Sequence, residues 1–234
     1  MLPIMAPIFS EVRVSPARSR SASDVAELLR RAIVSGELAP NERLVELDLA
    51  RDLSTNRAVV RGALAQLEQQ RLVVREPNRG VRVRSYSAEE AAEILETRAL
   101  LEGLVAARAA RNFDATAEAT LAEILAGMRA AHDTRNLPAY SQWNLQFHRA
   151  ILAIGQHETA SMLLSVLQTQ AVRYQFRTVL EPGRISRSLG EHEAIYAALC
   201  AHDEAAAERA MHAHIGAVVE TIRSIGAAIG LQAM

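Results

Sequence analysis

Apolar residues recur at three- and four-residue steps along most of the chain, and this spacing predicts a mainly α-helical protein. The first amphipathic helix is expected to begin at the N-cap Ser23 and to end at Gly36. Serine accepts the free amides of a first turn, and glycine adopts the left-handed conformation of a C-cap. Two further short helices, with apolar residues such as Leu47 and Val60, are expected to meet at residues 53–55. The pattern therefore predicts three helices near the N-terminus, the last two joined by a tight turn.

Two short β-prone runs follow these helices. They cover residues 72–76 and 81–84, and the Pro-Asn-Arg-Gly sequence between them is typical of a turn. Three helices followed by a hairpin make a winged helix-turn-helix domain, which we expect over residues 23–86. Residues 1–22 are interrupted by prolines and become rich in serine and arginine, so we expect them to form a flexible tail.

Two arginines lie one turn apart at the start of the third helix. Asn56 is expected to cap this helix, so that Arg57 and Arg61 lie on its outward face close to its N-terminal end. Arginine at such a position matches guanine O6 and N7 in the major groove of DNA. A pair of arginines is also an ordinary solvated surface, but Arg79 at the expected hairpin tip adds a third basic residue and favours DNA binding.

From residue 87 onward, Ala- and Leu-rich amphipathic segments follow one another without a convincing strand. Ser87 and Glu90 have the spacing of a capping box, which predicts that a new helix and a new domain begin there. The segments predict six helices and an all-α bundle over residues 87–234. The breaks between the helices are expected at residues 112–114, 136–138, 155–157, 181–183 and 202–203.

Charge is divided unevenly along the chain. Residues 11–85 hold fourteen arginines and ten acidic residues, whereas residues 86–234 hold twelve and seventeen, which gives +4 and −5. This division suggests a polyanion-binding head on a body that does not touch the polyanion. Cys200 is the only cysteine, so no internal disulfide is possible, and no apolar run approaches the length of a membrane span. We therefore expect a cytoplasmic protein with no membrane partner.

The sequence VELDLARDLSTNRAVVRGALAQLEQQRLVVREPNRGVRV resembles the DNA-binding domain of the GntR superfamily of bacterial transcription regulators. The chain departs from the usual pattern at Ala58, which replaces threonine and removes one usual contact, and at Gly62, which replaces glutamate. Asparagine at positions 41 and 56 also replaces the usual glycine and serine. The resemblance implies that the DNA-binding residues are Asn56, Arg57, Arg61, Arg79 and Gly80.

Three histidines of the second half lie among apolar residues at helical spacing. His148 comes four residues after Asn144, so both side chains share one face of the third bundle helix, while His192 and His214 lie on the fifth and sixth helices. Three imidazoles and an amide oxygen from three helices suit a divalent cation that keeps open coordination positions. A single histidine is more often an ordinary core or surface residue. That is our interpretation of the histidines at positions 132, 157, 202 and 212.

The sequences WNLQFHRAI and SLGEHEAIYAALCAHDEAAAERAMHAHI resemble the FCD effector domain of the FadR branch of GntR regulators, and six helices indicate the shorter VanR-like type. The resemblance implies metal ligands at Asn144, His148, His192 and His214, and nitrogen-rich sites suit Zn²⁺ or Ni²⁺. Asn144 replaces the family's aspartate, which leaves the charge of a cation uncompensated and favours an anionic effector as an additional ligand. In the alternative interpretation the metal is lost and the imidazoles bind the effector directly.

Arg98 and Glu102 lie one turn apart on the first bundle helix, at positions where the family has arginine and glutamate. Either they pair with each other, or Arg98 faces the cavity and binds a carboxylate of the ligand through its planar guanidinium group. Arg173 on the fourth bundle helix is a further candidate for effector binding.

These expectations describe a homodimeric transcription regulator, in the commoner case a repressor, that binds a palindromic operator in double-stranded DNA and responds to a small carboxylate-type effector. Within this class, the metal itself is an alternative signal. A metal-dependent hydrolase is a second class, because three histidines and an open position also describe hydrolytic zinc sites. The helix is expected to turn Glu191 and Glu193 away from His192, so no general base is apparent and an enzyme is not expected.

Overall fold

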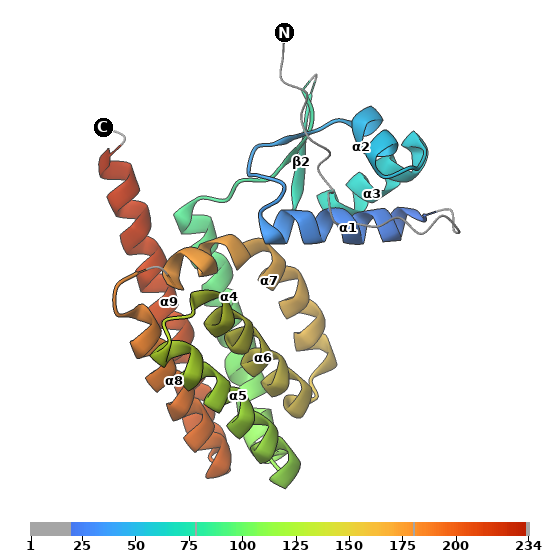
Figure 1. Cartoon of the computed structure of the whole chain (residues 1–234). Helices are drawn as coiled ribbons and strands as arrows, with labels where there is room; N and C mark the ends of the chain where they lie inside the picture. The colour runs from blue at the N-terminus through green and yellow to red at the C-terminus, as the bar shows by residue number, and fades with distance from the viewer. Residues whose placement is uncertain (1–19, 78, 180, 233–234) are drawn as a thin grey trace. The chain divides into compact units, whose positions relative to one another are not determined.

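The computed structural model describes residues 20–77, 79–179 and 181–232, and the chain divides into two compact units, Met1–Ser85 and Tyr86–Met234 (Figure 1). In the helices, the side chains of residues 168–169, 171–177, 179 and 229–232 lie outside the described part.

The N-terminal unit has three helices and a small antiparallel sheet. Its core is built from apolar side chains of the helices and the sheet, and Leu29, Val60, Leu64 and Val83 are fully buried in it. This arrangement confirms the predicted winged helix-turn-helix. The elements are α1 (Ala22–Ser35), α2 (Glu46–Asp52), α3 (Arg57–Gln69), β1 (Arg43–Leu44), β2 (Val73–Glu76) and β3 (Gly80–Val83), with the strands in the order β1-β3-β2.

The first helix begins two residues earlier than expected. Its N-cap is Ser21 and not Ser23, because the Ser21 hydroxyl accepts the Asp24 amide at 3.2 Å while the Asp24 carboxylate accepts the Ser21 amide at 2.9 Å. This capping box satisfies two free amides together. The helix ends at Gly36, as predicted, with a φ of 87°. Asn41, where the family usually has glycine, has a φ of 64°, which asparagine tolerates better than most residues.

The wing is the hairpin of β2 and β3. Val73 pairs with Val83 and Glu76 pairs with Gly80, which has a φ of 83° that L side chains rarely adopt. β1 pairs with the other edge of β3. This strand was not predicted, because two residues carry too little alternation to be recognised in a sequence.

The C-terminal unit is an all-helical bundle, and its described residues form six helices. Each predicted break lies at a junction between two of them, although residues 137–138 and 155 are themselves helical, and the capping box of Ser87 and Glu90 opens the first. The fold class predicted from the sequence is therefore confirmed. The helices are α4 (Ala88–Arg111), α5 (Ala115–Asp133), α6 (Leu137–Gly155), α7 (Glu158–Val179), α8 (Arg184–Cys200) and α9 (Glu204–Gln232).

Helix α4 packs along α9 and also contacts α6, α7 and α8 (Figure 1). Gly103 allows the close approach of α4 and α9, since a Cβ atom at this position would lie 2.2 Å from Nε2 of His212. Leu95, Phe147 and Ile195 belong to the apolar core that these helices share. Among the described helices, none is long and apolar enough to cross a membrane.

Candidate metal centre and nucleic-acid interface

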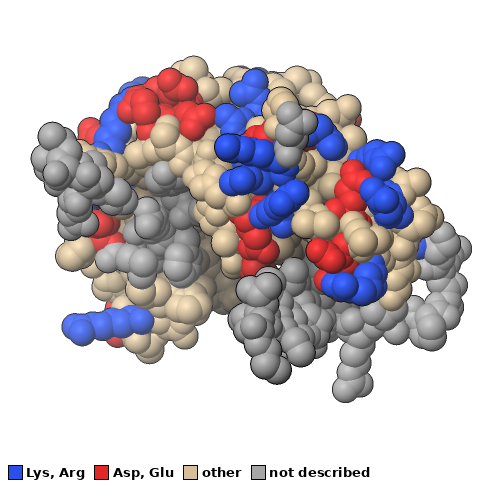
Figure 2. Space-filling model, turned by 90° about the horizontal axis from the view of Figure 1, so that it is seen from above, with Lys and Arg blue, Asp and Glu red and all other residues tan. Residues whose placement is uncertain are grey.

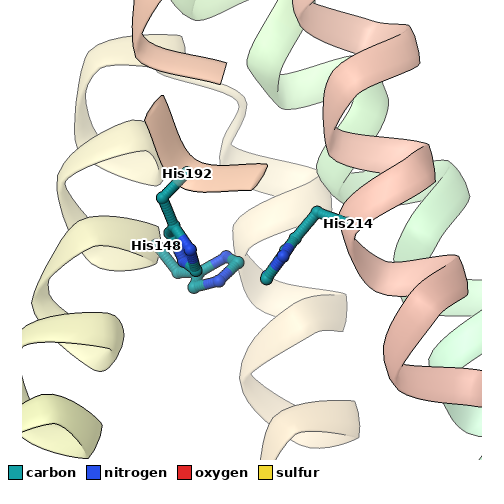
Figure 3. A group of neighbouring side chains, drawn as sticks. All are labelled: His148, His192 and His214. Carbon is teal, nitrogen blue, oxygen red and sulfur yellow. The ribbon is translucent and has the colours of Figure 1, made fainter. Parts of the chain in front are cut away.

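The structure brings His148, His192 and His214 together from α6, α8 and α9. All three are buried, with exposed fractions of 8%, 0% and 4%, and one ring nitrogen of each lies within 4.8 Å of the others. The ring centroids are 4.3–5.5 Å apart, and Figure 3 shows the rings pointing toward one another. Asn144, one turn before His148, is half-buried, and it lines a small cavity that His148 and His214 also line. Three of the four residues predicted as ligands therefore line one cavity, and the fourth, His192, packs against two of them.

Each of the three imidazoles has a hydrogen-bond acceptor at Nδ1. These acceptors are Glu102 for His148 at 2.7 Å, the Ser188 carbonyl for His192 at 2.6 Å, and Glu191 for His214 at 2.7 Å. An acceptor at Nδ1 holds the proton there and leaves Nε2 free to bind a cation, as in many metal sites. Nε2 of His192 is buried and has no hydrogen-bond partner within the described part of the chain.

The spacing and the donor set fit a metal ion. Two nitrogens that share a zinc ion at about 2.1 Å lie about 3.4 Å apart in tetrahedral geometry, so closing the site requires side-chain movements of about an ångström. Burial lowers the pKa of both His192 and His214 well below about 6.5, and neighbouring imidazoles lower it further. Neutral imidazoles are the form that binds metal. The surroundings therefore hold two of the three rings in the required state.

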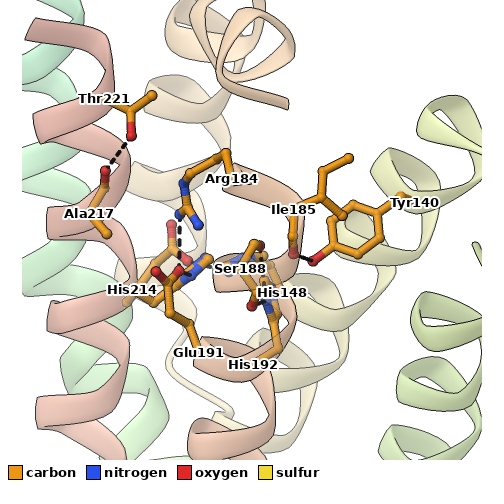
Figure 4. A network of polar contacts seen from close by, with 11 residues as sticks. Tyr140, His148, Arg184, Ile185, Ser188, Glu191, His192, His214, Ala217 and Thr221 are labelled. Atoms are coloured by element: carbon orange, nitrogen blue, oxygen red, sulfur yellow. Dashed lines mark hydrogen bonds and ion pairs between the residues drawn. The ribbon is translucent and has the colours of Figure 1, made fainter. Parts of the chain in front are cut away.

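Glu191 is a site residue that the sequence analysis missed. We expected the helix to turn Glu191 and Glu193 away from the direction of His192, but the Glu191 carboxylate accepts hydrogen bonds from another histidine of the cluster, His214, and, at 3.0 Å, from Arg184 (Figure 4). That expectation concerned only the direction of His192 and missed this contact, because the neighbouring helix α9 brings His214 to the Glu191 side of α8. Glu193 pairs instead with Arg129 at the surface.

Arg98 and Glu102 pair with each other, which is one of the two possibilities expected from the sequence. Nε and Nη2 of Arg98 donate to the same carboxylate oxygen at 2.9 and 2.6 Å, and both residues are buried. Burial raises the pKa of Glu102, but the positive charges of Arg98 and His148 outweigh this effect and lower it overall. The side chain of Arg173, the other predicted effector ligand, lies outside the described residues.

Two chains of hydrogen bonds of the same type thus support the histidine cluster. One joins Arg98, Glu102 and His148, and the other joins Arg184, Glu191 and His214. The two glutamates supply negative charge next to the imidazoles, so the site is not as poor in carboxylates as the replacement at Asn144 suggested. Because both glutamates are held by histidine and arginine, neither is placed as a general base for hydrolysis.

A small cavity lies beside the cluster. Its volume is about 50 Å³, well below the roughly 300–1,000 Å³ of pockets for drug-sized ligands. Burial raises the pKa of the Tyr140 hydroxyl, one of its lining groups, to about 12. The polar side chains around the cavity include Arg98, Tyr140, Asn144, His148, Arg184 and His214.

In the N-terminal unit, Asn56 caps α3 by accepting the Val59 amide at 3.0 Å, and this bond sets the position of the helix end. Arg57 and Arg61 are more than half exposed, as expected, but both donate to Glu46 on α2, at 3.5 and 3.2 Å. Hydrogen bonds from these arginines, foremost from Arg61, lower the pKa of Glu46. Figure 2 shows a face on which basic and acidic side chains alternate.

The contact of Glu46 with Arg57 and Arg61 was not predicted. Leu47 was expected in the buried stripe of α2, but 63% of its surface is exposed. The helix has only seven residues, so its periodicity did not define a face. At the wing, Arg79 and Gly80 are both exposed.

A winged helix with exposed arginines, joined to a helical bundle with a buried histidine cluster, defines a two-domain DNA-binding regulator. Residues 21–83 match the family described as bacterial regulatory proteins, gntR family, and residues 93–217 match the FCD domain. The chain belongs to the GntR family of bacterial transcription regulators and carries an FCD domain.

Curated relatives match most of the chain. The chain is 30% identical over 198 residues to the HTH-type transcriptional repressor GlaR of Escherichia coli K12, covering 80% of this chain and 89% of that protein. It is 26% identical over 215 residues to the repressor RspR of the same organism, covering 92% and 94%. Among solved structures, a GntR transcriptional regulator from Rhodococcus sp. RHA1 has a TM-score of 0.70 at 25% identity, covering 87% and 97%.

Proposed function

We propose that the protein is a repressor that binds a palindromic operator as a homodimer and releases it when a small carboxylate binds in the bundle beside a divalent metal ion. The observation that carries the proposal is a cluster of three buried imidazoles, two of which line a cavity together with buried arginines. The repressor function is supported by the similarity to GlaR and RspR.

DNA binding is assigned to the exposed end of α3 and to the wing. Arg57 and Arg61 lie in its first two turns, where side chains of a recognition helix meet base edges, and Arg79 and Gly80 form the wing tip. Asn56 fixes the helix end through its capping bond. One such domain reads few base pairs, and for that reason we propose a two-fold dimer on a palindromic site.

The dimer surface that we propose lies on α4 and α7, which pack against each other. Several of the large apolar side chains that remain exposed in the described residues are on these two helices. Exposed apolar residues on soluble proteins are usually scattered one by one, so a group of them on two packed helices indicates an interaction surface. Because contiguous exposed apolar surface marks interaction sites in soluble proteins, a second copy of the chain is the occupant that fits a symmetric operator. The residues are Leu100, Leu104, Met162, Leu163 and Val166.

The metal site that we propose consists of Asn144, His148, His192 and His214, with Zn²⁺ or Ni²⁺ as the fitting ions. When bound, the cation would supply positive charge and open coordination positions for an anionic effector. Arg98 and Arg184 line the same cavity and add to the positive charge. Ligand binding then favours one of two states of the regulator through its different affinity for them, which is the requirement for control of DNA affinity.

The DNA part of the proposal is tested by selecting binding sequences from a random duplex pool with the purified full-length protein. Enrichment of an inverted repeat supports a dimeric operator-binding protein, and enrichment of single half-sites or of no sequence contradicts it. The retained pool is then used to measure DNA affinity with and without added carboxylates.

The metal part is tested by elemental analysis and by titration of Zn²⁺ and Ni²⁺ into chelator-treated protein. His148→Ala, His192→Ala and His214→Ala should each lose most of the metal affinity, because two imidazoles and an amide leave few protein ligands. Asn144→Asp should bind metal at least about tenfold more tightly, which corresponds to about 1.4 kcal/mol, since it adds a carboxylate ligand. Wild-type protein that binds neither ion, together with an Asn144→Asp variant that gains no binding, would exclude the metal and leave direct binding of the effector by the imidazoles.

The metal as the signal is the alternative within this class. It predicts that operator affinity changes when Zn²⁺ or Ni²⁺ is added alone, without any carboxylate. A hydrolase is not favoured by any contact at the cluster, because Glu102 and Glu191 are both held by histidine and arginine.

A further inference from the structure

Arg184 is a buried arginine whose hydrogen-bonding capacity is largely unused. It is the first residue of α8, only 3% of its surface is exposed, and it lines the cavity. Its Nη2 donates to Glu191 at 3.0 Å, whereas Nε and Nη1 have no partner in the described part of the chain. Burying a charged donor without an acceptor is costly, so such an arrangement is uncommon unless a ligand completes it.

The place of Arg184 in the fold adds positive potential. Gly183, which precedes it, has a φ of 73° and provides no side-chain cap for α8. The Arg184 amide donates to the Glu181 carbonyl at 3.0 Å, and the first turn of the helix carries the positive end of the helix dipole. Figure 4 shows Arg184 at this end of α8, near Glu191 and His214. The arginine and the helix end therefore both favour an anion at this end of the cavity.

Arg184 is better suited to bind a ligand than Arg98. Arg98 uses two nitrogens, Nε and Nη2, to bind Glu102, and only its Nη1 is without a partner in the described residues. Arg184 binds its glutamate with one nitrogen and has two left. Because charge-assisted hydrogen bonds are the stronger ones, the group that gains most from an added carboxylate is Arg184.

We propose that Arg184 binds a carboxylate group of the effector, an inference that rests on the function proposed above. The small cavity limits the ligand to a short organic acid, and Leu95, Ile215 and Val218 provide the contact for its carbon chain. Arg184 shares Glu191 with His214, so a carboxylate on this arginine is one hydrogen-bonded residue away from the histidine cluster. Acid and metal are thereby expected to change each other's affinity by the same factor.

The test is a binding assay on the full chain, by thermal shift and calorimetry, with and without Zn²⁺. The probes are acetate, lactate and succinate, and the controls are the neutral acetamide, lactamide and succinamide. We expect at least one acid to raise the Tm of the wild type while its amide does not. Arg184→Gln should weaken that acid at least tenfold, and Arg184→Lys should retain part of the affinity. Arg187→Gln, an exposed arginine on the same helix, should bind like the wild type.

Arg184→Gln removes a partner of the buried Glu191, so its fold needs a separate check. The double variant Arg184→Gln/Glu191→Gln leaves neither charge unpaired, and circular dichroism and the Tm without ligand report whether it folds. A folded double variant that has lost acid binding supports the inference, and one that binds the acid like the wild type overturns it.

Two further outcomes separate this inference from the proposed function. If Arg184→Gln binds the acid normally and Arg98→Gln does not, Arg98 is the carboxylate ligand and the inference is wrong, while the proposed function stands. If none of the acids raises the Tm of the wild type but Zn²⁺ does, both the inference and the organic-acid effector are wrong, and the metal remains as the signal.

Discussion

Single hydrogen bonds decide what the histidine cluster can do. Each Nδ1 meets a different acceptor, and two of these acceptors are glutamates on helices other than the one that carries the histidine. Losing one of these acceptors would remove the hydrogen bond that fixes which ring nitrogen carries the proton. The chemistry of the site therefore depends on Glu102 and Glu191 as much as on the imidazoles themselves.

The lowered pKa values of His192 and His214 predict how the stability of metal-free protein depends on pH. Both groups are held neutral in the folded state, whereas in the unfolded chain their pKa is about 6.5. The unfolded state therefore binds more protons below this pH. The contribution of these two histidines to the free energy of unfolding should therefore be constant above about pH 6.5. It should decrease as the pH falls below that value.

Urea unfolding between pH 8 and pH 5 in the presence of a chelator measures this dependence. His192→Gln should show a shallower decrease than the wild type. His132→Gln, at the surface beside Asp133 and Ser186, should match the wild type. Equal slopes for the wild type and His192→Gln would contradict the prediction.

At the scale of helices, two contacts between neighbouring helices determine where side chains lie. Glu46 on α2 pairs with Arg57 and Arg61 on α3. The turn between the two helices therefore orients these arginine side chains as well as the helix backbones. Gly103 on α4 lets α9 come close enough for His212 to lie against it. The first contact joins two helices that are separated by a turn, and the second joins two helices that are remote in the sequence.

Glu46 is predicted to increase the selectivity of DNA binding. Its charge orients Arg57 and Arg61 and repels phosphate, so Glu46→Gln should bind random DNA more tightly and lower the ratio of operator to random affinity by about tenfold, or about 1.4 kcal/mol. Arg61→Ala should cost about 1–3 kcal/mol on the operator. Fluorescence anisotropy at fixed salt measures both affinities. Glu68→Gln, which loses a carboxylate paired with Arg75, is the control and should leave the ratio unchanged.

Gly103→Ala should destabilise the bundle by about 1–3 kcal/mol, because the added methyl group forces His212 out of its place. Gly190→Ala is the matched control. Its Cβ atom would meet nothing within 4 Å, so replacing glycine inside α8 should stabilise the protein by about 0.5–1 kcal/mol. Chemical denaturation gives both values, and a Gly103→Ala variant as stable as the wild type would show that His212 rearranges without cost.

At the scale of the whole molecule, the proposed control of DNA binding requires that two copies present their winged helices together. The two units of one chain have separate cores, and the predicted dimer surface lies entirely on the C-terminal unit. A change on this surface should therefore alter operator binding without disturbing either core.

Leu100→Glu should weaken dimerisation, since it places a charge on a surface where 67% of the leucine is exposed to solvent in the single chain. Sedimentation equilibrium should then show a monomer, and operator affinity should fall because the two half-sites bind independently. Val34→Glu, also an exposed apolar position but on α1, should remain dimeric. A dimeric Leu100→Glu variant would place the interface elsewhere.

Local patterns in the sequence were enough to predict the helices, the wing hairpin and their order along the chain, although not the short strand β1. Helical periodicity, breaks and capping residues act over a few neighbouring residues, so the six bundle helices, the wing turn with Gly80 and the cap at Asn56 were predictable from local patterns. Spacing on single helices also indicated His148, His192 and His214 as inward-facing residues, and the family resemblance grouped them in one site.

Only the tertiary structure decided which side chains meet across elements. The position of α9 beside α8 brings Glu191 to His214, and the turn between α2 and α3 brings Glu46 to Arg61. Arg184 and Glu191 are two turns apart on α8, a spacing that hinted at their contact but could not show that Arg184 is buried in a cavity. Helix packing sets these distances, and it depends on side chains from all the helices at once, which is why no local pattern contains them.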